Sequence, residues 1–275
     1  MLNDIKFSIV MPSYNAALYI QEAIDSIINQ TYRNFELIVV DGGSSDRTLE
    51  ILNLNQSHIS VLISEPDNGQ SDAFNKGFAL ASGDFYLWLN ADDLLAPQLL
   101  ELAADFLNKF EGCNWLAFNT IFIDNNGFIK RFHRAPPWIS NLNINHRPQV
   151  ECPTSIFHNN LLREAGGFDL RLDFTMDLDL WRTFISNGHR WFRLDYYGYI
   201  FRIHNESKTN KPIVPASPTF DEITQAEVLR KKHNIKVNFY LLTFSRVVKF
   251  FYCLPSSIIK IVRWKGKHVS KYFIV

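Results

Sequence analysis

The sequence predicts an α/β fold with a mostly parallel, Rossmann-like central sheet flanked by helices. Short apolar runs alternate with amphipathic segments four times within about 110 residues, as in parallel sheets with right-handed crossovers. Polar residues, often Asp or Gly, follow these runs directly. One run, residues 85–89, has no polar alternation, which is typical of a strand buried on both faces.

The predicted elements follow this alternation along the chain. Strands are expected at residues 7–11, 35–40, 59–64 and 85–89, with helices after residue 15, from about residue 47, over 70–81 and after residue 97. Beyond residue 115 the pattern changes. It predicts a hairpin of 118–123 and 128–132 with an Asn-Gly turn, a loop at 133–150, a strand at 152–158, helices at 160–165 and 177–186, and closing strands at 191–194 and 197–203.

Composition indicates a globular protein, since 47% of residues are hydrophobic and 20% are charged. The three cysteines are far apart, which favours a reducing cytosol over a disulfide framework. The first apolar run is short and ends at Pro12, so no signal peptide is expected. No uninterrupted apolar stretch is long enough for a transmembrane helix.

Charge is distributed unevenly, although the net charge is zero. Residues 228–275 contain eleven Lys or Arg and no Asp or Glu, so the rest has 28 − 11 = 17 basic and 28 acidic residues. Residues 216–275 are expected to form a basic, amphipathic, helical extension on an anionic membrane surface. The alternative is a helix packed on the catalytic domain. The extension is rich in aromatic and apolar residues, so its basic character fits a membrane surface better than nucleic acid.

Oxygen-bearing side chains follow the strand at 85–89. Asn90, Asp92 and Asp93 would lie at the carboxyl edge of the sheet, where open α/β sheets bind ligands. Such side chains suit Mg²⁺ or Mn²⁺ shared with substrate phosphates. The alternative is that Asp92 or Asp93 caps the next helix.

Asp41 ends the second strand and precedes Gly42 and Gly43. No G-x-G-x-x-G pattern is present, so a dinucleotide cofactor is not favoured. The carboxylate can accept hydrogen bonds from a base or a ribose, and the glycines allow a ligand to approach the backbone. The alternative is a turn with Asp46 as the helix cap.

Three further positions have polar residues at predicted element ends. An Asn68-Gly69 turn before Asp72 presents a helix N-terminus to the same edge, for ligand binding or simple capping. Asp177 and Asp179 begin a helix, where acidic residues are common, yet a carboxylate there can also act as a general base. His204 ends a strand, in a structural role or as a metal ligand.

Together these segments resemble family 2 glycosyltransferases of the inverting GT-A type, including those of bacterial polysaccharide biosynthesis. The resemblance runs from about residue 7 to 207. Its motifs, in order, are Pro12-Ser13-Tyr14-Asn15, Val39 to Thr48 with Asp41-Gly42-Gly43-Ser44-Ser45-Asp46, Asn68-Gly69, Asn75-Lys76-Gly77, Ala81-Ser82-Gly83-Asp84, Leu89-Asn90-Ala91-Asp92-Asp93, Gly166-Gly167-Phe168-Asp169, Met176-Asp177-Leu178-Asp179-Leu180-Trp181 and Arg202-Ile203-His204.

The resemblance implies a nucleotide-sugar donor bound by the N-terminal half. Asp41 and residues near Pro12 would contact the base or ribose, and Asp84 would lie near the uracil or ribose end. The residues expected at the substrates are Pro12, Tyr14, Asn15, Asp41, Gly43, Asn68, Gly69, Asp72, Lys76, Asp84, Asn90, Ala91, Asp179 and Trp181.

The resemblance also implies the metal site and the base. Asn90-Ala91-Asp92 stands where the family has Asp-x-Asp, with Asp92 as the ligand of Mg²⁺ or Mn²⁺ and His204 at the metal or diphosphate. Asp177 matches the catalytic base. Two positions depart from the family pattern: Asn90 replaces the first Asp, and Met176 replaces the acidic residue before the base.

The expected organisation is a GT-A catalytic domain at 1–215, with a nucleotide-sugar half at 1–112 and an acceptor half at 113–215, followed by the extension at 216–275. The expected activity is that of a hexosyltransferase acting on a lipid-linked saccharide in cell-surface polysaccharide synthesis, at the cytoplasmic face of the membrane. One alternative, a sugar-phosphate nucleotidyltransferase, would need a Gly-rich basic loop where residues 12–15 stand. The other is an inactive sugar-binding protein of the same fold.

Overall fold

The structure is a computed structural model that describes residues 4–135, 154–172, 175–205, 232–233 and 263–273. It contains a nine-stranded sheet in the order β3-β2-β1-β4-β8-β6-β9-β5, with β7 paired to β6. The strands are β1 (Phe7–Ser13), β2 (Phe35–Asp41), β3 (Val61–Ser64), β4 (Phe85–Trp88), β5 (Leu94–Leu95), β6 (Trp115–Asp124), β7 (Ile129–His133), β8 (Ser155–His158) and β9 (Phe192–Ile203).

Helices alternate with the first strands, as the sequence pattern predicts. They are α1 (Ile20–Ile28), α2 (Thr48–Leu54), α3 (Gln70–Ala79), α4 (Leu99–Lys109), α6 (Asn159–Ala165) and α7 (Met176–Ser186), with short 3₁₀ turns η1 (Gln56–His58) and η3 (Val269–Tyr272). β3, β2, β1 and β4 are parallel, and so are β6 and β9, whereas β8 runs antiparallel to both of its neighbours. The predicted α/β class with a mostly parallel central sheet is confirmed.

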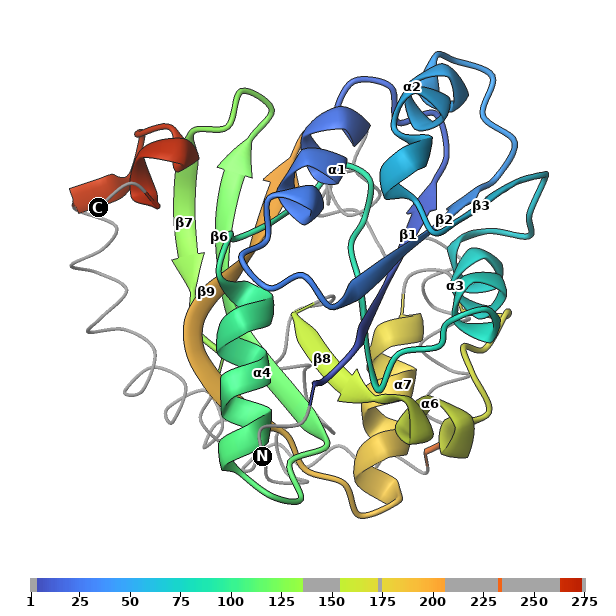
Figure 1. Ribbon diagram of the computed structural model, residues 1–275, viewed down its shortest axis with the longest axis vertical. Coiled ribbons are helices and arrows are strands. Elements are labelled where there is room, and N and C mark those ends of the chain that lie inside the picture. The colour runs from blue at the N-terminus through green and yellow to red at the C-terminus, as the bar shows by residue number, and fades with distance from the viewer. Residues whose placement is uncertain (1–3, 136–153, 173–174, 206–231, 234–262, 274–275) are drawn as a thin grey trace, which may run out of the picture.

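Helices cover the two faces of the sheet (Figure 1), and a hydrophobic cluster lies between the sheet and the helices on each face. Side chains alternate along β1, so Ile9 and Met11 pack with α1 and α4, while Val10 packs with α3, α6 and α7. The approach of α3 to β1 is close: a Cβ added at Gly77 would lie 2.4 Å from Val10 Cγ1. The arrowheads of β1 and β9 both point toward the top of Figure 1, so their carboxyl ends share one edge.

The predicted hairpin is confirmed as β6 and β7, with Gly127 at φ 81° in the turn. Part of the C-terminal extension packs on it. Ile129 N donates to Lys267 O at 2.8 Å, and Trp264 and Tyr272 join a hydrophobic cluster with Phe132. Residues 263–273 therefore follow the packed alternative, whereas residues 216–231 and 234–262 of the extension lie outside the described residues.

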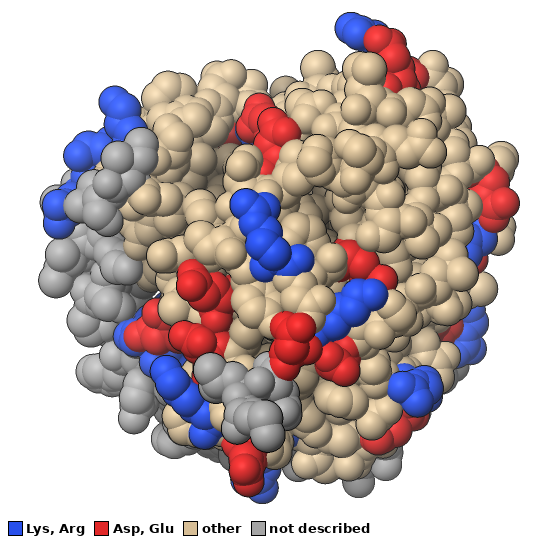
Figure 2. Space-filling view, in the orientation of Figure 1, with Lys and Arg blue, Asp and Glu red and all other residues tan. Residues whose placement is uncertain are grey.

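Two details of the strand pattern differ from expectation. The two predicted closing strands are one strand, β9, whose register with β6 shifts beside Phe118 and Asn119. β5 was not predicted, because two residues are too few for a periodic signal. Within the described part of the chain, no helix is long and apolar enough to cross a membrane. Figure 2 shows Lys and Arg interspersed with Asp and Glu on a mostly uncharged face.

Glu36 stabilises the amino edge of the sheet. Its side chain accepts hydrogen bonds from Lys6 Nζ at 2.8 Å, Ser8 Oγ at 2.5 Å and Ser82 N at 2.6 Å. Burial raises the pKa of Glu36, but these hydrogen bonds outweigh it and lower the pKa from 4.5 to about 2. The stabilisation is complete above the unfolded pKa and is lost as the pH falls toward 2.

Glu36→Gln should lower the free energy of unfolding by about 2 kcal/mol at pH 7, since it removes charge-assisted hydrogen bonds. The difference should shrink between pH 4.5 and about 2. Urea unfolding across this pH range measures it. Glu50→Gln, which breaks an exposed pair with Arg47, serves as control and should cost little. A difference for Glu36→Gln that did not change with pH would contradict the account.

Candidate active site

The turn after β4 contains two adjacent aspartates with different surroundings. Asp93 is buried, and accepts hydrogen bonds from Tyr199 Oη at 2.7 Å, Arg202 N at 2.8 Å and Asn90 Nδ2 at 3.0 Å. Burial, and then the charge of Asp92, raises the pKa of Asp93 well above its ordinary value, against these hydrogen bonds. Asp93 therefore links β4 to β9 and points away from solvent.

Asp92 is the accessible carboxylate of the pair. Its Oδ2 lies 2.9 Å from His204 Nε2, and the exposed fraction of the side chain is 30% for Asp92 and 11% for His204. The Tyr19 ring at the start of α1 lies 4.8 Å from the His204 ring, between centroids. The two predicted metal ligands are thus together at the carboxyl edge of the sheet.

Arg202 fixes the orientation of this turn. Its buried guanidinium donates from Nε to Asp92 O at 2.9 Å and from Nη2 to Glu22 at 2.7 Å, and it lies 4.7 Å from the Tyr19 ring centroid. One side chain therefore joins β9, α1 and the acidic turn. The sequence analysis included Arg202 only within the motif at residues 202–204 and gave it no role, although a charge within the otherwise apolar segment 197–203 was an available signal.

The hydrogen bonds of Asn90 explain why an amide can stand here in place of the first Asp of the family motif. Its Oδ1 accepts from Gln70 Nε2 at 2.9 Å, while its Nδ2 donates to Asp93. An aspartate at this position would have no hydrogen to donate and would add a third negative charge beside Asp92 and Asp93. The amide thus connects the turn to the start of α3. Ala91 is buried behind it.

Asp92 and His204 are suitable ligands for a divalent cation. They provide a carboxylate oxygen and an imidazole nitrogen, a combination that Mn²⁺ accepts more readily than Mg²⁺. Among the described residues, no group of three or more acidic, His or Cys side chains is placed to hold a metal. A cation at this pair would therefore take its remaining ligands from substrate phosphates and water.

Asp41 lies fully buried at the end of β2 and organises the loop that follows. It accepts hydrogen bonds from Ser44 N at 3.0 Å and Ser64 Oγ at 2.8 Å, and also from the Ser44 hydroxyl. Gly43 has φ 79°, which disfavours any side chain there. The structure thus gives Asp41 a role in loop geometry. Its contact with a base or ribose stays a prediction.

The loops after β1 and β2 form a single cradle. Asn15, with φ 48°, donates from its backbone to Ser44 Oγ at 2.8 Å and accepts from Ser45 N at 2.9 Å. Tyr14 beside it is 67% exposed, whereas Pro12 is buried within β1. An exposed ring on a cradle held by hydrogen bonds is suited to stack on a planar ligand.

The loop before α3 lies beside this cradle. Gly69 N donates to Asp67 Oδ1 at 2.9 Å, and Asn68 N donates to Asp72 Oδ2 at 3.0 Å. Asp72 thus orders the loop before α3, and α3 has no side-chain cap, so the simple capping alternative is not what the structure shows. Lys76 pairs with Glu65 at 2.9 Å. A Cβ added at Gly42 would lie 2.7 Å from Asp67 Oδ2, so the loop before α3 directly contacts the loop after β2.

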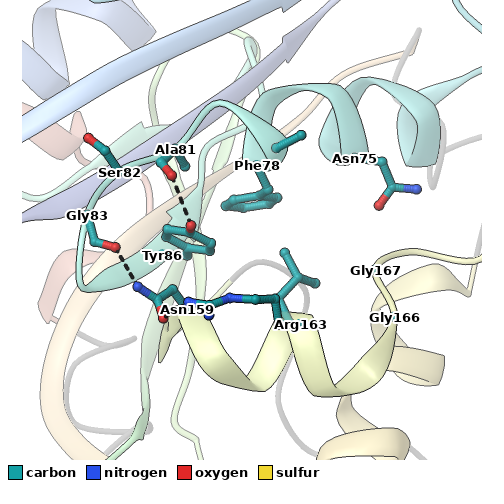
Figure 3. A pocket seen from close by; sticks show the side chains of 12 residues that line it. Asn75, Phe78, Ala81, Ser82, Gly83, Tyr86, Asn159, Arg163, Gly166 and Gly167 are labelled. Carbon is teal, nitrogen blue, oxygen red and sulfur yellow. Dashed lines mark hydrogen bonds between the residues drawn. The ribbon is translucent and has the colours of Figure 1, made fainter.

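The prediction that Asp84 contacts the donor was wrong, because Asp84 lies at the opposite edge of the sheet. It precedes β4 and accepts from Lys6 N at 2.9 Å, whereas donor binding was expected at the carboxyl ends. The cavity of about 590 Å³ between α3 and α6 opens at this same edge (Figure 3). Its polar side chains are already hydrogen-bonded within the protein: Asn75, Ser82, Tyr86, Asn159 and Arg163.

The prediction that Trp181 contacts a substrate was also wrong. It is 1% exposed and stacks between Trp88, at 5.5 Å, and Trp115, at 5.1 Å between centroids. This places its ring in the core between sheet and α7, where no substrate reaches it.

Asp177 and Asp179 lie in the first turn of α7, and both are buried. Asp179 was expected at a substrate. Instead its Oδ1 lies 2.7 Å from His233 Nε2 and its Oδ2 accepts from Lys232 Nζ at 2.8 Å. Burial raises the pKa of Asp179, but hydrogen bonds from His233 and Lys232 outweigh it, so the pKa falls below its ordinary value. The sequence pattern contained no signal for these two partners.

Comparison with known proteins agrees with this fold. The model of the family described as Glycosyl transferase family 2 matches residues 8–165, more than half of the chain, so the chain belongs to this family. An uncharacterised glycosyltransferase of Rickettsia typhi is 32% identical over 212 residues, which cover 74% of this chain and 65% of the relative. The chain thus spans about 65% of the length of that relative.

Two further proteins that are similar to this chain have names that state an activity or a ligand. WfgD of Escherichia coli, a UDP-Glc:α-D-GlcNAc-diphosphoundecaprenol β-1,3-glucosyltransferase, is 31% identical over 189 residues, covering 68% of this chain and 73% of WfgD. The structure of S. aureus TarS 1–349 in complex with UDP-GlcNAc has a TM-score of 0.70 at 21% identity, over 90% of this chain and 73% of that one. That likeness shows the fold.

Substitutions of the two adjacent aspartates should have different effects on the free energy of unfolding. Asp93→Asn should lower the free energy of unfolding by about 2 kcal/mol, because the amide presents a donor to groups that already donate. Asp92→Asn, the matched control, should change stability little, since its carboxylate is partly exposed. Chemical denaturation without metal checks both. Equal losses in the two variants would contradict the assignment of Asp93 as the structural carboxylate.

Proposed function

We propose that this chain is an inverting glycosyltransferase, which moves a sugar from a nucleotide-diphosphate sugar to a hydroxyl of a saccharide acceptor. The observation that carries the proposal is the Asp92–His204 pair at 2.9 Å, on the same sheet edge as the cradle around Asp41. Membership of glycosyl transferase family 2 supports it.

The proposed donor is a UDP-sugar. The activity for which WfgD is named and the TarS complex both involve UDP-sugars. In this chain the cradle offers the exposed Tyr14 ring for stacking and backbone groups of the Gly43 loop for the ribose. Asp92 and His204 lie at the end of β4 and β9, where the diphosphate would follow.

A divalent cation, Mn²⁺ or Mg²⁺, is proposed to bind at Asp92 and His204 together with the diphosphate. When bound, it neutralises the charge that develops on the leaving diphosphate. A structural neighbour, the mannosyltransferase PcManGT of Pyrobaculum calidifontis, is described in complex with GDP-Man and Mn²⁺, at TM-score 0.57. Arg202 holds the Asp92 backbone in place without becoming a ligand itself.

Asp177 is proposed as the general base. It would take the proton of the acceptor hydroxyl as that oxygen attacks the anomeric carbon. Attack from the face opposite the diphosphate inverts the anomeric configuration in one displacement, so no enzyme nucleophile is required. Asp177 lies in the first turn of α7 and is 9% exposed.

The acceptor is proposed to be a lipid-linked saccharide at the cytoplasmic face of the membrane. The acceptor in the WfgD name, a diphosphoundecaprenol-linked GlcNAc, supports this. Arg263, Lys265 and Lys267 are exposed on the described part of the extension, beside Trp264. Trp264 itself packs against Tyr272 on the hairpin, so the proposed contact with an anionic interface is made by these exposed basic side chains.

A donor screen with Mn²⁺ tests the activity. Thermal shift with UDP-glucose and UDP-GlcNAc should show stabilisation of the wild type, and Asp92→Asn should lose the metal-dependent part of it. Asp177→Asn should still bind while turnover falls by about 10²-fold or more, the size of a general-base contribution. Release of UDP with a lipid-linked saccharide acceptor measures that turnover.

The matched control is Asp84→Asn, at the opposite sheet edge, which should bind the donor as the wild type does. Loss of donor binding in this variant would contradict the assigned edge. If no nucleotide sugar bound with any metal, the glycosyltransferase proposal would fail in favour of an inactive sugar-binding protein.

Membrane binding is tested by vesicle flotation. The full chain should float with phosphatidylglycerol vesicles and not with neutral ones, more weakly as salt rises. Replacing Arg263, Lys265 and Lys267 together by Gln should weaken binding by roughly 3 kcal/mol, on the order of a hundredfold. Equal flotation with neutral vesicles would contradict an electrostatic surface.

A further inference from the structure

The carboxylate of Asp41, which was expected at the base or ribose, has its acceptor positions filled by the protein. It is fully buried, and accepts hydrogen bonds from Ser13 Oγ at 3.3 Å, Ser44 N at 3.0 Å and Ser64 Oγ at 2.8 Å, and from the Ser44 hydroxyl. An ionised carboxylate offers about four acceptor positions, and four donors use them here. A ligand in the cradle therefore meets the loop around Asp41 and not this carboxylate.

The loop before α3 brings a second carboxylate to the same cradle. Glu65 N donates to Asp41 O at 3.0 Å, so this loop is held against the end of β2. A Cβ added at Gly42 would lie 2.7 Å from Asp67 Oδ2 and 3.0 Å from Asp67 Cγ. The Asp67 carboxylate thus occupies the space that a side chain at position 42 would fill.

Asp67 differs from Asp41 in the use of its two oxygens. Its Oδ1 accepts from Gly69 N at 2.9 Å, whereas none of the described residues donates a hydrogen bond to its Oδ2. Oδ2 is also the oxygen closer to the Cβ position of Gly42, at 2.7 Å against 3.2 Å for Oδ1. Asp67 is partly exposed. Such an oxygen is suited to accept a hydrogen bond from a ligand.

Gly42 leaves room for this carboxylate. Its φ lies outside the left-handed region that favours glycine, so the backbone at this position would accept an alanine. What an added Cβ would meet first is the end of a flexible side chain, the Asp67 carboxylate. The lack of a side chain at position 42, and not a strained turn, therefore allows Asp67 to reach the cradle.

We propose that Asp67 is a specificity-determining residue for the nucleotide of the donor. Its Oδ2 accepts a hydrogen bond from the uridine, either from the uracil N3–H or from a ribose hydroxyl. Gly42 and Asp67 act as a pair, because the glycine leaves the space that the carboxylate enters. Asp41 orders the loop beneath them. This inference rests on the proposed function, since it takes the cradle as the site of the nucleoside.

Calorimetric titration of the full chain with UDP in the presence of Mn²⁺ tests the role of Asp67. Asp67→Asn keeps an oxygen for Gly69 N and presents an NH₂ group in place of Oδ2. It should weaken UDP binding by about tenfold or more, because a hydrogen bond to a charged group is lost. Binding of UDP by Asp67→Asn with the affinity of the wild type would overturn the proposal.

Glu65→Gln is the matched control, because Glu65 lies in the same loop but pairs with Lys76 at 2.9 Å. It should bind UDP as the wild type does. If Glu65→Gln weakened binding as much as Asp67→Asn, the effect would belong to the charge of the loop, and the specific contact would be refuted.

Nucleotide analogues identify the group that Asp67 recognises. CDP lacks the N3–H, while 2′-deoxy-UDP and 3′-deoxy-UDP each lack one ribose hydroxyl. The wild type should bind at least one of the three about tenfold more weakly than UDP. In Asp67→Asn that preference should disappear, since the carboxylate that produces it is absent. A preference of unchanged size in Asp67→Asn would contradict the assignment.

Gly42→Ala tests the geometry by a second route. The added methyl group should displace the Asp67 carboxylate, so UDP binding should weaken while the thermal unfolding temperature changes little. In Asp67→Asn, the further change Gly42→Ala should add little loss, because both substitutions act through one carboxylate. Additive losses would show that the methyl group meets the ligand itself, against the proposed pairing.

The outcomes separate this inference from the proposed function. If the wild type bound no UDP with Mn²⁺, the proposed donor and the role of Asp67 would fail together. If the wild type bound UDP and Asp67→Asn bound it equally well, only the role of Asp67 would fail.

Discussion

The buried Asp93 carboxylate is the interaction on which the site depends. It joins the end of β4 to Tyr199 and Arg202 of β9, more than 100 residues away in sequence. A buried carboxylate is costly, and the three donors offset only part of that cost, because burial still raises the pKa of Asp93. Because Asp93 is held in this way, its neighbour Asp92 must turn toward solvent and His204. The structural aspartate thus determines where the functional one points.

The same division recurs around the sheet edge. Asp41, Asp72 and Asp179 each satisfy backbone or side-chain donors of neighbouring loops, while Asp92 and Asp177 are the carboxylates proposed for chemistry. Polar residues at strand ends and helix starts therefore have two kinds of role. Some order the loops and others contact ligands, and a rigid arrangement of the second kind requires the first.

The sequence predicted the fold well because helix and strand periodicity are local properties, and the α/β class with nearly all of its long elements is confirmed. The sequence analysis also predicted that Asp92 and His204 lie together, and their side chains are 2.9 Å apart. It could not separate Asp92 from Asp93, since their difference lies in Tyr199 and Arg202, distant partners that no local pattern reveals. Asp84 and Trp181 were avoidable errors. Asp84 precedes its strand, and Trp181 lies on the apolar face of its helix, so the local pattern already indicates that neither residue faces the carboxyl edge of the sheet.

The most direct test is a crystal structure with UDP-glucose and Mn²⁺, with an anomalous difference map at the manganese edge. The account predicts one Mn²⁺ peak bonded to Asp92 and His204, with the diphosphate on the same ion and the uridine in the cradle formed by the loops after β1 and β2. A manganese peak bonded to Asp93 in place of Asp92, or UDP in the cavity between α3 and α6, would contradict it.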